Sequence, residues 1–282
     1  MLIFNKQTAL TTYLSTFWTT KTTIGFVPTM GALHDGHLSL LRKALQENKL
    51  VVISIFVNPT QFNNPEDLEK YPRTLERDVQ KIATLSDKIV IYAPNVDDIY
   101  KGKLVSEHFT YDGLEHQMEG KYRPGHFNGV GTIVKRLFEI VQPTNSYFGE
   151  KDFQQLQIIK KLVQKHKITV NVIGCPIHRE KNGLAMSSRN ELLSETEKEA
   201  AALIYKTLTV AKKMFHTKSA QKVSNFVVQT FETHAEFSVD YFQIADETTL
   251  KPCLRKSSNK KYRAFIAVFI NNIRLIDTIS LN

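Results

Sequence analysis

Two histidines three residues apart are the side chains most suggestive of chemistry in this sequence. His34 and His37 lie in PTMGALHDGHLSLL (residues 28–41), with Gly31 and Gly36 beside them. The segment follows an apolar run and precedes a helical pattern, so it is expected at a helix N-terminus, where unpaired N–H groups bind phosphate. Imidazole donors there stabilise charge that phosphoryl oxygens gain in a transition state. Zinc is not indicated, because no third ligand lies nearby and no His-Glu-x-x-His occurs.

The spacing H-x-G-H after a buried strand resembles the HIGH-type nucleotidyltransferases, which include class I aminoacyl-tRNA synthetases and small adenylyltransferases. The resemblance implies that the protein binds ATP and releases pyrophosphate, and it calls for a second phosphate-binding motif downstream. LAMSSRN (184–190) resembles a variant of the synthetases' KMSKS loop, with two hydroxyls and a guanidinium as donors. By itself this segment would be interpreted as a polar turn. Next to H-x-G-H, phosphate binding is the favoured interpretation.

Four blocks in order resemble the pantothenate synthetase (pantoate–β-alanine ligase) family. They are PTMGALHDGH, SIFVNPTQFNNPEDLEKYPRT (54–74), RPGHFNGV (123–130) and YFGEKDFQQL (147–156). The resemblance runs from about residue 24 to 194 and continues more weakly to the final NNIRLIDT. It implies that (R)-pantoate is activated with ATP to pantoyl adenylate and pyrophosphate. β-Alanine then attacks the acyl carbon, which gives pantothenate and AMP. ATP is thus a substrate, Mg²⁺ is expected with it, and no tightly bound organic cofactor is implied.

The same resemblance implies the site residues. The ATP-binding positions are Met30, Gly31, Ala32, Leu33, His34, Asp35, Gly36, His37, Gly149, Glu150, Lys151, Asp152, the backbone of His178, Met186, Ser187, Ser188 and Arg189. Three of these are expected to be catalytic. His37 acts as proton donor or charge stabiliser with His34 beside it, and Lys151 stabilises charge on the pentacoordinate phosphorus. Gln61 and Gln155 match the contacts to pantoate, and Gln61 also matches the β-alanine contact.

The roles of three other polar residues stay open at this point. His126 and Arg123 either face the site or serve packing and helix capping, and Arg73 either binds anions or pairs with a carboxylate. An acidic pair that follows the YPRT block in the family, and that can approach a metal, is replaced here by Arg77-Asp78. The protein ligands of Mg²⁺ are therefore unassigned.

The elements that must position these residues follow an alternating pattern. Apolar strand-like runs cover 24–30, 51–57, 88–94, a short segment near 145–152, and 168–176, and amphipathic helical patterns lie between them. Strands that alternate with helices predict a parallel sheet covered on both faces. We therefore expect an α/β fold with a Rossmann-like, doubly wound parallel sheet of the HIGH-type nucleotidyltransferase class. Residues 62–74 are interpreted as a loop that closes over the intermediate.

The pattern changes after about Pro176. A helix is predicted from a capping box, Ser194 with Glu197, and a second helix covers roughly 219–235. Three strand-like runs follow at 239–246, 262–270 and 273–279. The expected domains are a nucleotide- and pantoate-binding domain, 1–176, and a smaller C-terminal α+β lid domain, 177–282.

Composition limits the function classes. With 42% hydrophobic residues among 282, the chain is expected to form a real core rather than stay disordered. Its net charge of +9 favours anionic partners. The basic excess is spread along the chain, and its densest cluster, 251–263, is interpreted as a solvated loop between strands. The glycines at 129–131 lack the third glycine of a dinucleotide fingerprint, and no Walker A motif occurs, so NAD chemistry and P-loop hydrolysis are disfavoured.

Rival functions remain to be weighed. A basic nucleic-acid-binding protein on the same fold is disfavoured by the diffuse charge, and a tRNA-directed synthetase by the short chain. Another HIGH-type adenylyltransferase is the nearest alternative. Two distant cysteines, Cys175 and Cys253, and the lack of a signal-like or membrane-spanning stretch fit a cytoplasmic protein. The expected partners are ATP, (R)-pantoate and β-alanine, with no nucleic acid and no membrane, and a homodimer is expected from the family resemblance.

Overall fold

The computed structural model describes residues 1–282, and the chain forms two compact units. The first comprises 1–115, 119–149 and 155–175, and the second comprises 116–118, 150–154 and 176–282. The second unit thus takes in two short segments that precede residue 176. The expected domain boundary at residue 176 stays a prediction.

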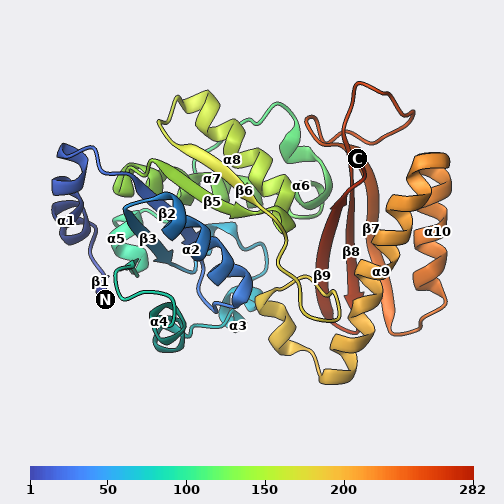
Figure 1. Cartoon of the computed structure of the whole chain (residues 1–282), viewed down its shortest axis with the longest axis horizontal. Helices are drawn as coiled ribbons and strands as arrows, with labels where there is room; N and C mark the ends of the chain where they lie inside the picture. Colours follow the sequence, from blue (N-terminus) through green and yellow to red (C-terminus); the bar gives the residue numbers. More distant parts are fainter. The chain divides into compact units, whose positions relative to one another are not determined.

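The first half of the chain alternates strands with helices (Figure 1). Its strands are β1 (Leu2–Phe4), β2 (Ile24–Thr29), β3 (Leu50–Ile55), β4 (Val90–Tyr92), β5 (Asn145–Gly149) and β6 (Asn171–Cys175). Its α-helices are α1 (Gln7–Thr19), α2 (Asp35–Glu47), α3 (Pro65–Lys70), α4 (Leu75–Ala83), α5 (Val96–Tyr100), α6 (Met118–Tyr122), α7 (His126–Val141) and α8 (Phe153–His166). Short 3-10 helices are η1 (Pro59–Gln61), η2 (Leu114–His116) and η3 (Glu150–Asp152).

The six strands form one parallel sheet in the order β1-β4-β3-β2-β5-β6. Successive residues of a strand point to opposite faces, and β2 shows which helix covers each face. Val27 packs in a core cluster with Leu38 and Leu41 of α2, whereas the Phe26 ring meets that of Phe138 on α7 at 6.3 Å. Helices therefore cover both faces, and the predicted doubly wound α/β fold is confirmed.

The second unit is a small α+β structure. It contains η4 (Ser188–Leu192), α9 (Glu195–Thr217), α10 (Ala220–Glu232), β7 (Phe237–Asp246), β8 (Tyr262–Ile270) and β9 (Ile273–Ser280). The strands form an antiparallel sheet in the order β7-β8-β9. Even-numbered residues of β8 from Tyr262 to Ile270 join the core that α9 and α10 complete. The predicted capping box is confirmed, since Glu197 N–H donates to Ser194 Oγ at 3.3 Å and Ser194 N–H to Glu197 at 2.8 Å.

Three local features differ from the sequence expectations. The elements β1 and α1 were not predicted, because β1 is short with Leu2 and Ile3 47% and 45% exposed, and α1 is rich in Thr, a poor helix former. Residues 62–74 are not all loop, because Asn64 caps α3, with Pro65 at its first position. The cluster 251–263 ends inside β8, where Arg263 is buried.

Candidate active site

The turn between β2 and α2 lies where the order of the sheet strands reverses. The chain passes from β2 outward through β3 on one side, and β5 is the neighbour of β2 on the other. Ligands of open α/β sheets bind beyond the carboxyl ends of the strands at this point. Residues 30–37 follow the carboxyl end of β2, and residues 150–152 follow that of β5. The segments predicted to bind ATP therefore leave the sheet from adjacent strands.

His34 and His37 form a reciprocal cap at the N-terminus of α2. Gly36 N–H donates to His34 Nδ1 at 3.1 Å, and His34 N–H donates to His37 Nδ1 at 3.3 Å. The two rings lie 4.0 Å apart between centroids. Because each Nδ1 accepts a backbone hydrogen bond, the neutral ring carries its proton on Nε2. The expected strand-to-helix junction is confirmed, and both histidines are oriented there as Nε2–H donors.

Asp78, on α4, supports this turn from behind. Its Oδ2 accepts from Ala32 N–H at 2.9 Å and its Oδ1 from Leu33 N–H at 2.7 Å, and its side chain is fully buried. Lys81, one turn further along α4, donates to the Leu33 carbonyl. The backbone has φ of +84° at Gly31 and +50° at Ala32. With these angles, the N–H groups of Ala32 and Leu33 face the Asp78 carboxylate. Asp78 thus fixes the path from β2 to the histidine cap.

The buried environment of Asp78 also shifts the pKa of its carboxyl. Burial raises the pKa of this carboxyl, although hydrogen bonds from Leu33, Ala32 and Thr74 and the charge of Lys81 act in the opposite direction. Its oxygens are turned toward the backbone of the turn. Asp78 therefore does not present its carboxylate to a metal. No group of three or more His, Cys, Asp and Glu side chains is arranged to hold a metal ion.

Gln61 is held by an amide network that sequence reasoning missed. Asn58 donates through Nδ2 to Gln61 Oε1 at 3.1 Å and to the Gly129 carbonyl at 3.2 Å. Tyr100 donates its hydroxyl to Asn58 Oδ1 at 2.5 Å. Gln61 Nε2 in turn lies 3.1 Å from the sulfur of Met30. Two predicted site residues, Met30 and Gln61, are therefore in contact.

The close approach of α7 to η1 explains the glycine at position 129. A Cβ at Gly129 would lie 2.3 Å from the Thr60 carbonyl oxygen, so only glycine fits there. His126, the first residue of α7, is buried and its Nδ1 lies 2.9 Å from the Gln61 carbonyl. Arg123 approaches His126 Nε2 at 3.4 Å and Glu119 at 3.8 Å. His126 thus packs at the start of α7 against the backbone of Gln61, and whether it also faces the site stays a prediction.

Arg73 hydrogen-bonds to backbone carbonyls, and its proposed anion-binding role stays a prediction. Its guanidinium donates to the backbone carbonyls of Leu68 at 3.1 Å and of Glu69 and Tyr71 at 3.2 Å each. These carbonyls belong to the last turn of α3 and the residue after it, where carbonyls lack helical partners. Arg73 therefore caps α3 and fixes the local shape of segment 62–74.

Lys151 lies in a short turn that β8 holds from both sides. Arg263 donates to Glu150 Oε2 at 3.1 Å and its guanidinium lies 4.0 Å from the Phe153 ring centroid. Arg263 is buried and is balanced by a second carboxylate, that of Glu247, at 3.0 Å. The turn η3 that carries Lys151 is thus fixed at the residues before and after it. The Lys151 ammonium itself lies 3.9 Å from Asp152.

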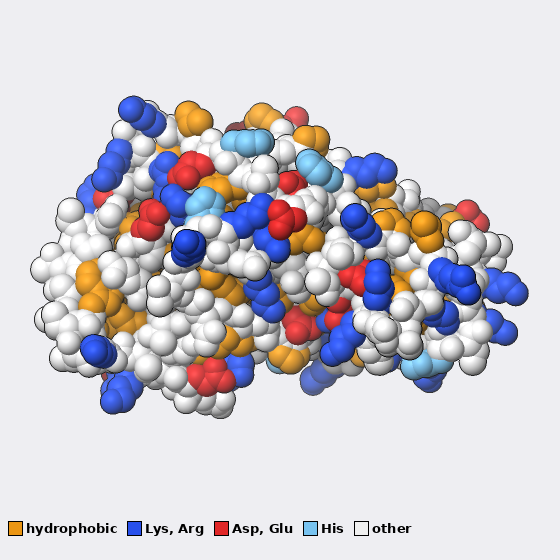
Figure 2. Space-filling view, turned by 90° about the horizontal axis from the view of Figure 1, so that it is seen from above, with side chains coloured by type: hydrophobic (Ala, Val, Ile, Leu, Met, Phe, Trp, Pro, Cys, Tyr) orange, Lys and Arg blue, Asp and Glu red, His pale blue; other side chains and the backbone are white.

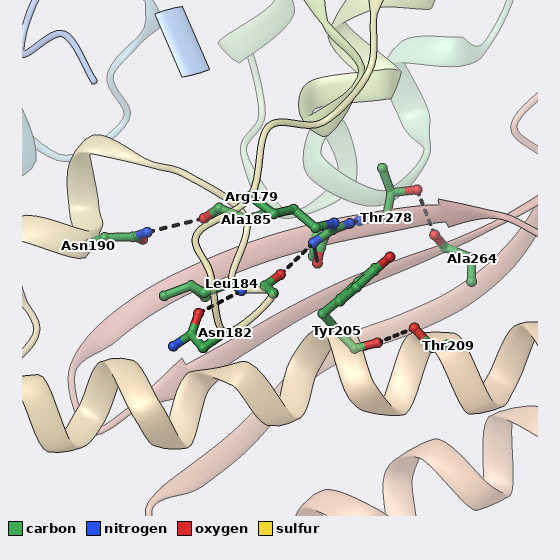
Figure 3. Close-up of polar contacts among 11 residues, drawn as sticks. Arg179, Asn182, Leu184, Ala185, Asn190, Tyr205, Thr209, Ala264 and Thr278 are labelled. Atoms are coloured by element: carbon green, nitrogen blue, oxygen red, sulfur yellow. Dashed lines mark hydrogen bonds and ion pairs between the residues drawn. The ribbon is translucent and has the colours of Figure 1, made fainter. Parts of the chain in front are cut away.

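Arg179 and Ala185 pair in a small hairpin (Figure 3). His178 precedes this hairpin, and the Met186–Arg189 motif follows it. Met186 N–H donates to the His178 carbonyl at 3.1 Å. Ser187 then caps η4, because its hydroxyl accepts from Arg189 N–H at 3.3 Å. The structure therefore brings together the residue expected at adenine and those expected at the phosphates.

The remaining predicted residues lie at the edges of these groups. Gln155 is half-buried on α8, Gly149 ends β5, and Asp35 is exposed at the first position of α2. On the face drawn in Figure 2, Lys and Arg side chains are scattered among acidic and uncharged ones. None of the helices combines the length and the apolar composition needed to cross a membrane.

Comparison with known proteins gives close relatives over the full length of the chain. A family model described as pantoate-beta-alanine ligase matches residues 2–280. The pantothenate synthetase of Flavobacterium psychrophilum is 66% identical over 281 residues, which cover 100% of this chain and 100% of that protein. The pantothenate synthetase of Christiangramia forsetii is 49% identical over 282 residues, again 100% of both chains.

Solved structures agree. The pantothenate synthetase of Thermus thermophilus has a TM-score of 0.91 at 36% identity, and the match covers 100% of this chain and 99% of that chain. The pantoate-beta-alanine ligase of Francisella tularensis, complexed with beta-gamma ATP and beta-alanine, has a TM-score of 0.79 at 36% identity over 100% and 98% of the two chains. The chain therefore belongs to the pantoate–β-alanine ligase family.

Proposed function

We propose that this chain condenses (R)-pantoate with β-alanine in two steps at the expense of ATP. A pantoate carboxylate oxygen attacks the α-phosphorus of ATP, which forms pantoyl adenylate and releases pyrophosphate. The β-alanine amine then attacks the acyl carbon, which gives pantothenate and releases AMP. Adenylation is needed because a carboxylate is a poor acyl donor. The observation that carries the proposal is the reciprocal histidine cap on α2, in a chain of this family.

The hydrogen bonds of the cap indicate what the two histidines do in the first step. Negative charge grows on the phosphoryl oxygens as the bond between the α-phosphorus and the pyrophosphate oxygen breaks. Hydrogen-bond donors that are already in position stabilise this charge. With both Nδ1 atoms engaged by backbone N–H groups, His34 and His37 offer Nε2–H toward these oxygens. The N-terminus of α2 adds the partial positive charge of its helix dipole. His37 is the donor that we assign to the transferred phosphate, with His34 beside it.

The other motifs hold the reactants. Lys151 supplies a point charge to the phosphates, and the hydroxyls of Ser187 and Ser188 with the Arg189 guanidinium supply further donors. Gln61 is oriented through Asn58 to bind pantoate and β-alanine, and Gln155 is assigned a second pantoate contact. These roles are carried over from the family motifs.

Mg²⁺ is proposed to arrive with the nucleotide. It neutralises charge on the β- and γ-phosphates. The chain offers no cluster of three or more candidate ligands for a resident ion, and Asp78 is committed to the backbone of Ala32 and Leu33. We therefore assign the metal no protein ligands.

The decisive experiment is pantoate-dependent exchange of labelled pyrophosphate into ATP without β-alanine. Exchange is expected in wild type and is expected to be lost in His37→Ala. His216→Ala, which changes an exposed histidine in the last turn of α9, is the matched control and should exchange normally. Folded wild-type protein without exchange would refute the two-step route.

Oxygen labelling separates this proposal from other adenylyltransferase chemistry. Pantoate labelled with ¹⁸O in its carboxylate should transfer one labelled oxygen to AMP when β-alanine is present, since the bridging oxygen leaves with the phosphate. Transfer of the adenylyl group to a phosphate acceptor, the alternative for a HIGH-type enzyme, would keep that group in the product and release no AMP. A tRNA-directed or nucleic-acid-binding function would instead show as affinity for tRNA or duplex with a steep salt dependence.

Assembly and location complete the proposal. We propose a homodimer, as the family resemblance implies, and light scattering after size-exclusion chromatography tests it. A cytoplasmic location is supported by two buried cysteines that form no disulfide. Fractionation of the producing cells tests this location.

A further inference from the structure

The hairpin that precedes the phosphate-binding motif is tightly hydrogen-bonded. Arg179 and Ala185 form an antiparallel bridge, and Glu180 N–H donates to the Leu184 carbonyl at 2.8 Å. Gly183 turns the chain with φ of +97°, and a Cβ there would lie 2.7 Å from the Tyr205 ring, so the turn lies directly on α9. The hairpin leads at once into Met186, where the motif begins (Figure 3). Any shift of the hairpin would therefore be passed to the motif.

The far end of the motif is also tied to the hairpin. Asn190, buried in η4, donates through Nδ2 to Glu180 Oε1 at 2.7 Å and to the Ala185 carbonyl at 3.1 Å. Residues 186–189 thus run between two attachments to the same hairpin. Their position depends on what holds the hairpin in place.

Arg179 supplies the strongest attachment to the rest of the second unit. Its Nη1 and Nη2 donate to Oδ2 and Oδ1 of Asp277 on β9 at 2.7 and 3.0 Å, and Nη1 also donates to the Gly183 carbonyl at 3.1 Å. The guanidinium lies 3.7 Å from the ring centroid of Tyr205 on α9. The Asp277 side chain is only 3% exposed, and that of Arg179 is 16% exposed. A planar, two-pronged, stacked ion pair of this kind needs arginine and not merely a positive charge.

We propose that Arg179 is a positioning residue for the phosphate-binding motif 186–189, which it holds by fixing hairpin 179–185 to Asp277 and Tyr205. The proposal rests on the proposed function in that it takes this motif to be the site of ATP phosphates. It concerns a residue that touches neither nucleotide nor substrate. Arg179 acts through Ser187, Ser188 and Arg189.

The test replaces the planar guanidinium of Arg179 with a lysine ammonium of the same charge. Arg179→Lys can neither bridge both Asp277 oxygens in a plane nor stack on Tyr205 as the guanidinium does. Its kcat/KM for ATP in pyrophosphate exchange is expected to fall about tenfold or more, while KM for pantoate stays within about twofold of wild type. Arg274→Lys is the matched control, because Arg274 lies on the same strand as Asp277 and pairs with a carboxylate, Asp240, through Nε at 3.0 Å and Nη2 at 2.9 Å. The control is expected to leave both parameters near wild type.

A merely structural role would give a different result. If Arg179→Lys and Arg274→Lys lower the melting temperature similarly and both keep wild-type kcat/KM for ATP, the proposal is overturned. Equal losses in KM for ATP and for pantoate would overturn it as well. Asp277→Asn provides a second variant if Arg179→Lys does not fold, and it should show the same selective loss for ATP. When Asp277→Asn is combined with Arg179→Lys, it should add little to the loss in kcat/KM for ATP, because both changes break the same contact.

Direct binding separates this proposal from the function on which it rests. Calorimetry with α,β-methylene-ATP, which cannot be cleaved at the reacting bond, reports on the motif without pantoate and without catalysis. The dissociation constant is expected to rise about tenfold or more in Arg179→Lys and to stay unchanged in Arg274→Lys. If wild type binds this analogue but shows no pantoate-dependent exchange, the function fails while the positioning role is still decided by the two variants. Equal affinity of wild type and Arg179→Lys overturns the positioning role.

Discussion

Asp78 offers a stringent test of how the histidine cap is positioned. Its carboxylate accepts the N–H groups of Ala32 and Leu33 inside the fold. Removing the acceptor of a buried donor costs roughly 1–3 kcal/mol. Asp78→Ala, which removes it for both donors, should therefore lower the free energy of unfolding by about 2–6 kcal/mol, less whatever is gained by no longer burying a carboxylate.

Asp78→Asn is the finer probe, because its carboxamide has one oxygen and one NH₂ group where the carboxylate has two acceptors. It can satisfy one of the two N–H groups, and its NH₂ then faces the other, so the expected loss is about half that of Asp78→Ala. Urea unfolding measures the free energy, and pyrophosphate exchange measures the effect on the cap. Asp112→Asn, which changes an exposed carboxylate paired with Lys161 and Lys165, is the control and should leave exchange unchanged.

The pH dependence measures the opposing contribution, the free-energy cost of burying the Asp78 carboxylate. Burial raises the pKa of Asp78, so the folded chain holds this proton more tightly than the unfolded chain, in which an Asp titrates near about 3.9. The stabilisation that this proton provides is complete below that value and is lost as pH rises through the raised folded pKa. The difference in unfolding free energy between wild type and Asp78→Asn should therefore shrink as pH rises from about 4. A difference that grows over this window, or Asp78→Ala with wild-type stability and exchange, would refute the reasoning.

Five other substitutions test three separate parts of the site and fold. His37→Ala and Lys151→Ala should each lower the exchange rate by orders of magnitude, and near-normal rates in both would contradict their assignment. The unfolding midpoint should stay unchanged in Lys151→Ala and fall in His37→Ala, which loses one hydrogen bond of the α2 cap. Arg263→Lys should lower kcat of exchange by about 10- to 100-fold by loosening the turn around Lys151, and Glu150→Gln, which weakens the same contact, should act in the same direction. Ser194→Ala should cost about 1 kcal/mol of unfolding free energy by removing the cap of α9, with exchange kinetics as in wild type; a loss of exchange would place that helix start in the site.

The features that could be predicted from the sequence are those that a local residue pattern determines. Alternation of apolar runs with helical patterns predicted the parallel sheet, and the spacing of His34 and His37 after a strand predicted their place at a helix start. The same approach did not predict β1 and α1, because a short exposed strand and a Thr-rich helix carry little periodic signal and are stabilised by packing instead. It assigned 62–74 to a closing loop, since a helix as short as α3 depends on its caps, Asn64 and Arg73.

The contacts that position the chemistry were beyond the reach of sequence patterns. Asp78 and the Ala32 amide are 46 residues apart, and Arg263 and Glu150 are 113 apart. Nothing in a single sequence links such pairs, because the pairing arises only when distant elements pack. A buried charged residue is the one signal that such a partner exists, and burial is not visible before the fold is known.

Three of the segments assigned to the phosphates are held in the same physical way. Asp78 holds the His34–His37 turn, Arg263 holds the turn of Lys151, and Arg179 holds the hairpin that leads to the Ser187–Arg189 motif. Each holding side chain is buried or nearly so, and each pairs with groups that would cost free energy if left unpaired, so each segment has one favoured position rather than several. Phosphoryl transfer depends on donors that are already in place when charge develops. We therefore expect substitutions at Asp78, Arg263 and Arg179 to reduce catalysis by misplacing donors rather than by removing them. Each variant should carry out the same chemistry as wild type, with a lower rate or a weaker affinity for ATP.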